Sequence, residues 1–124
     1  MKDIKFKFEE LQVYQKAFDF VDLSYKTIKN FPDIERYALA SQFTRASLSV
    51  ALNIAEGSGD SNSQFNRFLQ IAIGSVKECV VCITIAKRQG YIKIEQEIEL
   101  REKLEELSKM ITSLQKYLKT NSKN

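Results

Sequence analysis

Histidine and tryptophan are both missing from this chain of 124 residues, and proline occurs only once. Without histidine the chain cannot build Ser-His-Asp or Cys-His nucleophile arrangements, most zinc sites, or the Glu-x-x-His ligand pairs of di-iron bundles. The start of the chain, MKDIKFKFEE, also lacks the apolar run that follows the basic residues of a signal peptide. We therefore expect a cytoplasmic protein that is not an enzyme and that holds no cofactor or metal.

Cysteine is scarce as well, and its two copies, Cys79 and Cys82, form a C-x-x-C motif. A redox pair of this spacing sits at the start of a helix, where the helix dipole lowers the thiol pKa. This motif instead lies inside a long apolar pattern, and the two further soft ligands of a metal site are missing. We interpret both cysteines as small, reduced core side chains, in agreement with a cytoplasmic location.

The composition is that of an ordinary soluble domain, with 44% apolar and 28% charged residues and a net charge of +3. Residues 1–62 carry a net charge of −1 and residues 63–124 carry +4, so no basic nucleic-acid-binding tail is present. Residues 38–55 approach the length of a membrane span, but seven of these 18 residues are polar. We expect one domain, residues 1–124, that makes no contact with a membrane.

Apolar residues recur at the spacing of packed helices over four segments, about residues 8–29, 34–56, 64–89 and 95–119. Pro32 separates the first two segments, and Asp33 is the expected N-cap of the second. Gly57 is the expected C′ residue that ends the second segment, and Gly90 ends the third. The pattern predicts an all-α protein, an up-down-up-down antiparallel four-helix bundle.

The first three predicted helices are apolar over about half of their circumference or more, whereas the fourth has one apolar stripe and a charged opposite face. A lone bundle of this size would leave much of that apolar surface in water. Soluble monomers rarely expose contiguous apolar patches beyond a few hundred square ångströms. We therefore predict a homo-oligomer.

A polar stripe interrupts the second helix, and the third helix offers partners for it; the residues are Gln42, Arg45, Ser49, Asn53 and Glu56, with Ser75 and Glu78. We favour a buried hydrogen-bonded network in which Arg45 neutralises a carboxylate and the network fixes helix register and subunit contacts. A second interpretation makes Glu56 and Glu78 a carboxylate pair for metal or acid-base chemistry. In a third, Arg45 and its neighbours reach a ligand or a channel.

The residues in and around this stripe also resemble a known family. The motifs are Tyr37-x-Leu39-x-x-Gln42-x-x-Arg45-Ala46-x-x-Ser49-x-x-x-Asn53-Ile54-Ala55-Glu56-Gly57, then Phe68-Leu69-x-x-Ala72-x-Gly74-Ser75-x-x-Glu78, and Gly90-Tyr91. They resemble the bacterial four-helix-bundle family named for proteins encoded in intervening sequences of 23S rRNA genes. The resemblance covers Phe8 to Leu118 and implies a ring-shaped homopentamer. The family is similar to accessory proteins of diversity-generating retroelements, which are thought to bind nucleic acid and a reverse transcriptase.

Two functions follow as hypotheses. The first is a non-catalytic oligomeric scaffold that binds nucleic acid, RNA ahead of DNA, through phosphate contacts multiplied around a ring. Its candidate contacts are basic residues that the bundle should gather at one end, namely Lys2, Lys5, Lys7, Arg67, Lys116, Lys119 and Lys123. The alternative is a protein-protein interaction scaffold of a mobile-element or toxin-antitoxin-like system that binds no nucleic acid. The sequence leaves the choice between RNA, DNA and a protein partner open.

Overall fold

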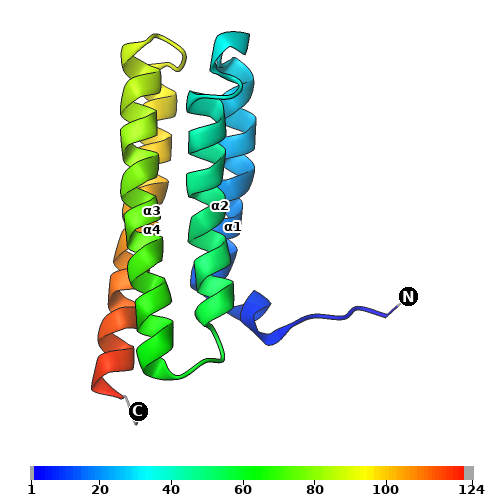
Figure 1. The fold of residues 1–124 in the computed structure, drawn as a ribbon, viewed down its shortest axis with the longest axis vertical. Helices are drawn as coiled ribbons and strands as arrows, with labels where there is room; N and C mark the ends of the chain where they lie inside the picture. The colour runs from blue at the N-terminus through cyan, green and yellow to red at the C-terminus, as the bar shows by residue number, and fades with distance from the viewer. Residues whose placement is uncertain (1, 122–124) are drawn as a thin grey trace.

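The chain folds into four long helices that run alternately in opposite directions (Figure 1). The computed structural model describes residues 2–121 and places α1 at Gln12–Thr27, α2 at Leu39–Gly57, α3 at Asn62–Arg88 and α4 at Ile94–Thr120. Consecutive helices pack against each other, and α1 closes the bundle against α4. Residues 2–121 contain no strand. The predicted antiparallel four-helix bundle is confirmed.

The apolar stripes of all four helices pack together in a single hydrophobic core. The largest fully buried side chains are Phe20, Phe43, Ile54, Leu69, Ile83, Leu100, Leu104, Leu107 and Ile111. Burying each contributes about 1.5–3 kcal/mol relative to leaving it in water. By length and composition α3 could also cross a membrane. Here it packs between α2 and α4, as an apolar helix in the core of a bundle does.

The first helix begins later than the sequence pattern suggested. Residues Lys7–Glu10 form a separate 3-10 turn, η1, and the extended backbone of Leu11 (ψ 127°) divides it from α1. The Glu9 carboxylate closes this turn by accepting a hydrogen bond from the Phe6 N–H (2.8 Å). Residues before it run away from the bundle as an extended arm at the end where α4 finishes (Figure 1).

The second helix also starts later, because the chain makes two turns after Pro32. Residues Ile28–Asn30 and Asp33–Glu35 form the 3-10 turns η2 and η3, and α2 begins only at Leu39. The N-cap residue is Ala38 rather than the expected Asp33. The Glu35 side chain reaches the first turn, where its Oε1 accepts a hydrogen bond from the Leu39 N–H (3.1 Å). The prediction that this helix begins near Ile34 is therefore wrong.

Gly90 and Gly57 lie at two helix ends and are required for different structural reasons. Gly90, with φ of +80°, ends α3: its N–H donates to the Lys87 carbonyl (3.1 Å), and the Tyr91 N–H donates to the Ala86 carbonyl (2.9 Å). Gly57 is instead the last residue of α2 and has no positive φ, so the expected C′ role is wrong. A Cβ at Gly57 would lie 2.8 Å from Phe68 Cβ, which shows that close packing requires this glycine.

Candidate functional site

The polar stripe of α2 lies along the seam between α2 and α3. Ser75 Oγ donates to Ser49 Oγ (2.7 Å), and Asn53 Nδ2 donates to the same oxygen (3.0 Å). Closer to the start of α2, Gln42 Nε2 donates to Glu78 Oε2 (3.0 Å). The stripe therefore joins the two helices at two levels and fixes their relative position along the bundle.

The stripe is only partly buried, because the apolar stripe of α2 points into the core and leaves this flank at the surface. Ser75 is buried and Ser49 and Asn53 are half-buried, but Gln42 and Arg45 are exposed. Within residues 2–121 no carboxylate lies within ion-pair distance of Arg45. The carboxylate partner predicted for Arg45 is therefore missing from the described part of the monomer.

The structure does not bring Glu56 and Glu78 together. Ser49 and Ser75 mark a common level of the two antiparallel helices. Glu56 lies seven residues beyond Ser49 toward one end, and Glu78 lies three residues beyond Ser75 toward the other. At 1.5 Å per residue the two carboxylates are about 15 Å apart along the bundle. They cannot share a metal ion or a proton, so the interpretation as a catalytic carboxylate pair is wrong.

Apolar side chains surround the polar stripe on the outer surface of α2 and α3. The exposed fractions are 61% for Leu52 and 47% for Ile71, and Val81 and Ile85 are exposed on the same side of α3. We call these four residues the α2–α3 patch. The charged residues next to them are Arg45, Glu56 and Glu78 of the polar stripe. Exposed apolar side chains grouped in this way are typical of a protein contact.

The accessible surface area is also larger than that expected for a compact monomer. The accessible surface of the chain is 8194 Å². A compact monomer of 14.3 kDa is expected to expose roughly 6,800 Å². The extended N-terminal arm contributes to the excess, and the exposed apolar side chains of α1, α2 and α3 contribute the kind of surface that a partner would cover.

The predicted basic residues do lie toward one end of the bundle, with one exception that cannot be placed. The arm carries Lys2 and Lys5, and Lys7 is the first residue of η1. Arg67 lies in the second turn of α3, and Lys116 and Lys119 lie near the end of α4 (Figure 1). Lys123 lies outside the described residues. Of these cations only Lys5 has an ion pair within residues 2–121, at 3.9 Å from Asp3.

Acidic groups lie at the same end. They are Asp3, Glu9, Glu10, Glu56 and Asp60, so five carboxylates accompany the six described cations. The local net charge per subunit is small. Any attraction for phosphate must therefore come from individual unpaired cations and from the number of copies in an assembly.

Both cysteines lie in the core, as the sequence predicted. Cys79 and Cys82 are buried and form no disulfide. Burial raises the pKa of the Cys79 thiol far above its usual value, and the neighbouring Cys82 and Glu78 add to the rise. Burial also raises the pKa of Cys82. Thiols held protonated in this way are poor nucleophiles.

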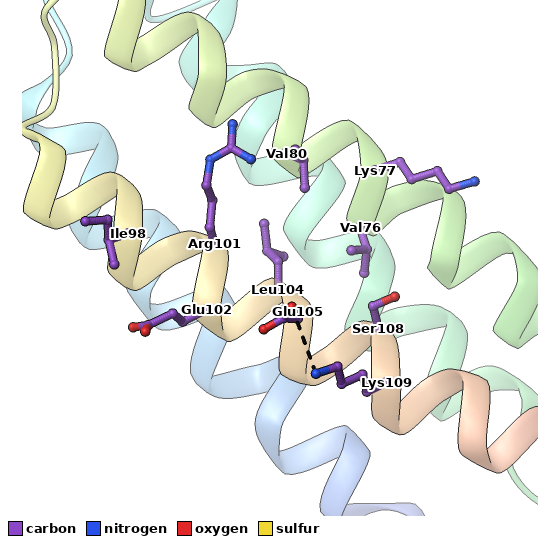
Figure 2. Close-up of a pocket in the computed structure, with 10 residues that line it drawn as sticks. All are labelled: Val76, Lys77, Val80, Ile98, Arg101, Glu102, Leu104, Glu105, Ser108 and Lys109. Carbon is purple, nitrogen blue, oxygen red and sulfur yellow. Dashed lines mark ion pairs between the residues drawn. The ribbon is translucent and has the colours of Figure 1, made fainter.

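A groove of about 620 Å³ follows the seam between α3 and α4 (Figure 2). Its floor is apolar, with Val76, Val80 and Leu104, and charged side chains line its rim. On that rim Lys109 Nζ lies 3.9 Å from a Glu105 carboxylate oxygen. The ten lining residues include no cysteine or histidine, and the two carboxylates on the rim belong to Glu102 and Glu105.

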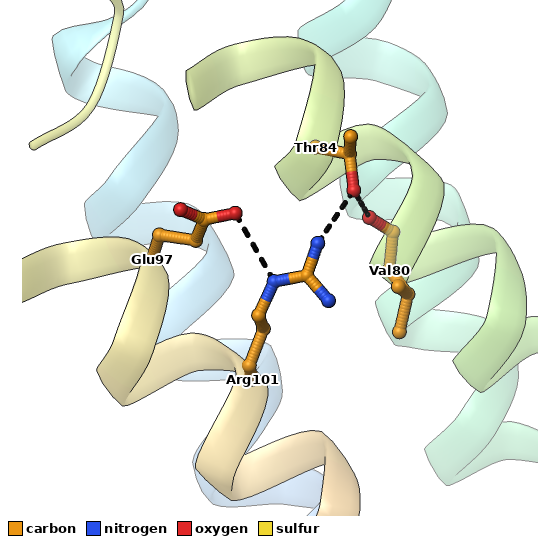
Figure 3. Close-up of polar contacts among 4 residues, drawn as sticks. All are labelled: Val80, Thr84, Glu97 and Arg101. Atoms are coloured by element: carbon orange, nitrogen blue, oxygen red, sulfur yellow. Dashed lines mark hydrogen bonds and ion pairs between the residues drawn. The ribbon is translucent and has the colours of Figure 1, made fainter. Parts of the chain in front are cut away.

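A second polar cluster ties α4 to α3 next to this groove (Figure 3). Arg101 Nε donates to Glu97 Oε2 (3.1 Å), and Arg101 Nη2 donates to Thr84 Oγ1 (2.7 Å). The Thr84 hydroxyl in turn donates to the Val80 carbonyl (2.8 Å). The guanidinium thus bridges two helices, which is a structural role.

The sequence reasoning missed two further contacts. Ser24 Oγ and Ser47 Oγ lie 2.7 Å apart in the core between α1 and α2. Tyr91 OH donates to Glu35 Oε2 (2.8 Å), and this hydrogen bond, with burial and the Glu35 charge, raises the pKa of Tyr91. The available signal was a serine at an apolar heptad position in the first case, and in the second the tyrosine directly after a helix-ending glycine.

Comparison with known proteins identifies the fold and the family. The family model described as 23S rRNA-intervening sequence protein matches residues 9–113. A solved protein of unknown function from the S23 ribosomal protein family of Bacteroides thetaiotaomicron is similar in structure, with a TM-score of 0.74 and 25% sequence identity. The match covers 84% of this chain and 98% of that one. No curated protein matches the chain.

Proposed function

The chain belongs to the 23S rRNA-intervening sequence protein family, and from this premise we propose that it is a non-catalytic subunit of a homo-oligomeric ring, a pentamer, that binds nucleic acid through its basic surface. The observation that carries the assembly is the α2–α3 patch. Its four apolar side chains are exposed to water in the single chain, whereas most other apolar side chains of α2 and α3 are buried in the core. A second copy would remove them from water.

The assembly is tested by light scattering on purified protein. A pentamer has a mass of about 72 kDa, five times the 14.3 kDa of one chain. Ile71→Asp places a charge in the α2–α3 patch and should reduce the mass to that of a monomer. Ile98→Asp is the matched control, because Ile98 on α4 is 50% exposed and Ile71 is 47% exposed. A wild-type monomer at micromolar concentration would refute the ring.

Nucleic-acid binding is supported by the basic end. In residues 2–121 the cations Lys2, Lys7, Lys116 and Lys119 have no carboxylate within 4.0 Å, so their charges are available to phosphate. One subunit offers few contacts. A ring that presents the same end of every subunit on one side multiplies them, because later contacts form at a high effective concentration.

The experiment is a gel-shift titration with structured RNA and with duplex DNA at about 50 and 200 mM salt. Phosphate binding should weaken by an order of magnitude or more over this range. Replacing Lys116 and Lys119 by glutamine should weaken binding, whereas the same change at Lys103 and Lys109, higher on the same helix, should not. An assembled ring that binds neither probe at low salt would refute this half of the proposal.

The carboxylates at the basic end favour one alternative. Because five acidic side chains lie among the cations, this surface could instead recognise a protein of mixed charge. The protein would then be a scaffold of a mobile-element or toxin-antitoxin-like system that binds no nucleic acid. A ring that binds no RNA or DNA in the titration is the outcome that supports this second function.

A further inference from the structure

A second exposed apolar surface lies on α1, on the opposite flank of α2 from the α2–α3 patch. Tyr14, Phe18 and Tyr25 share one face of α1, and we call them the aromatic row. The Tyr14 and Phe18 rings are 5.9 Å apart, and Phe8 packs edge-on against Tyr14 at 5.1 Å. Phe18 and Tyr25 are 48% and 47% exposed. Single exposed aromatics are ordinary, but a row along a helix is a surface that a partner can cover.

Contacts within the bundle fix the side of α1 on which this row lies. Tyr25 shares one surface depression with Ser41 and Thr44 of α2 and another with Glu99 and Lys103 of α4. The α4 side of α1 is marked by the ion pair of Lys16 with Glu106 (3.6 Å). At about 100° per residue all three aromatic residues lie on the far side of α1 from Lys16. The aromatic row therefore flanks α2 on one side, whereas the α2–α3 patch flanks it on the other.

Two different apolar surfaces predict a particular kind of contact. In a two-fold dimer one surface meets its own copy, so a single patch is sufficient. When one surface meets a different surface of the next copy, the contact repeats and closes into a ring if the rotation permits. The presence of two patches on either side of α2 favours this second arrangement.

The two surfaces also lie at the same level along the bundle. The Ser24–Ser47 contact marks a common level of α1 and α2, and the Ser49–Ser75 hydrogen bond does so for α2 and α3. At 1.5 Å per residue Phe18 lies about 9 Å below the Ser24 level, with Leu52 about 7.5 Å and Ile71 about 9 Å below it. Rotation about an axis parallel to the helices preserves these levels, so Phe18 would meet Leu52 and Ile71 of the next copy.

Two opposite charges beside the two surfaces are consistent with contact between the aromatic row and the α2–α3 patch. Arg45 lies on the α2–α3 side and Asp22 lies beside the aromatic row, and neither has an ion-pair partner within residues 2–121. Asp22 lies about 3 Å below the Ser24 level and Arg45 about 3 Å above it. The resulting offset of about 6 Å along the bundle is within the span of an extended arginine side chain.

We infer that the aromatic row of one copy packs on the α2–α3 patch of the next, with Asp22 facing Arg45 and with α2 of every copy turned toward the ring axis. This inference rests on the proposed homo-oligomer and names its two contacting surfaces. It leaves the charged outer face of α4 in solvent, and it gives Arg45 the carboxylate partner that its own subunit does not supply.

Cysteine cross-linking tests the pairing. Phe18→Cys and Ile71→Cys are made as single variants, co-expressed and oxidised; the native Cys79 and Cys82 are buried and should not react. A covalent dimer in the mixture, with none from either variant alone, supports the inference. A dimer from Phe18→Cys alone, or a mixture that assembles without cross-linking, overturns it. Ile98→Cys mixed with Ile71→Cys is the control that should give no dimer.

Charge exchange covers the case in which the cysteine variants fail to assemble. Asp22→Arg and Arg45→Asp each place like charges in contact, so each should raise the subunit dissociation constant about tenfold or more. The double variant should recover most of the loss; no recovery overturns the pairing of Asp22 with Arg45. Light scattering on the wild type separates the two proposals, since a monomer refutes the oligomer itself, whereas a ring that shows neither effect refutes only these surfaces.

Discussion

Replacing Gly57 with alanine should destabilise the protein although alanine is the better helix former. Gly57 is the last residue of α2, where the chain turns into α3. A Cβ there would lie 2.8 Å from Phe68 Cβ and 2.9 Å from Phe65 Cδ1. Non-bonded carbon atoms are at their best separation at about 3.5–4.0 Å. The first contact is the more serious, because every residue except glycine carries a Cβ at position 68.

The size of the effect is the difference of two terms. Overpacking a close contact costs typically about 1–3 kcal/mol. Exchanging glycine for alanine within a helix gains about 0.5–1 kcal/mol, and less at a terminal position. The free energy of unfolding should therefore fall by about 1–2 kcal/mol. For a domain of this length about 4 °C of melting temperature corresponds to 1 kcal/mol, so the expected drop is about 4–8 °C.

The measurement is thermal and urea unfolding followed by circular dichroism at one protein concentration, since assembly would couple to stability. Gly74→Ala is the matched control. Gly74 lies inside α3, and a Cβ there would have nothing within 4 Å. It should stabilise the protein by about 0.5–1 kcal/mol, provided that light scattering shows an unchanged mass. If Gly57→Ala were as stable as Gly74→Ala, close approach would not be the reason for this glycine.

Two further substitutions probe contacts that the sequence did not reveal. Tyr91→Phe removes the hydrogen bond to Glu35 and should lower the free energy of unfolding, as measured by urea titration. Because folding raises the pKa of Tyr91, the stability that its proton provides is complete below the ordinary tyrosine pKa and is lost as the pH rises through the folded value. The wild type should therefore lose stability above about pH 10 more steeply than Tyr91→Phe, and parallel pH profiles would contradict the assignment. Ser24→Ala should lower the free energy of unfolding by about 1 kcal/mol, measured by thermal melting, because the buried Ser47 hydroxyl loses its partner on α1. Adding Ser47→Ala to this variant should lower it by less than the first change did. Equal and additive losses would show that the two hydroxyls do not interact.

The sequence by itself determined the secondary structure class and most of the core. The spacing of residues such as Phe43, Val50 and Ile54 is a local property of one helix, so it can be read without knowing what packs against it. The same holds for Cys79, whose apolar neighbours along the helix already predicted a buried thiol. The motif around Asn53 and Gly57 predicted the family, which the comparison confirmed.

Only the tertiary structure decided how the polar stripe is used. Periodicity placed Glu56 and Glu78 on facing sides of two helices, but the level at which antiparallel helices meet depends on packing between them. The Ser49–Ser75 contact sets that level and holds the two carboxylates apart. The start of α2 depended on packing too, because the Glu35 carboxylate that accepts from the Leu39 N–H also accepts from Tyr91, 56 residues later.

Gly57 illustrates the same division. Its place after a helical pattern is visible in the sequence and suggested a backbone conformation that favours glycine. Its ordinary φ and its contact with Phe68 show instead that α3 approaches too closely for a side chain. Local propensity reports what one segment prefers, whereas seams, levels and close approaches arise when four such segments pack together. For that reason the flanks of α2, with Arg45 exposed between two apolar surfaces, could be recognised only in the folded chain.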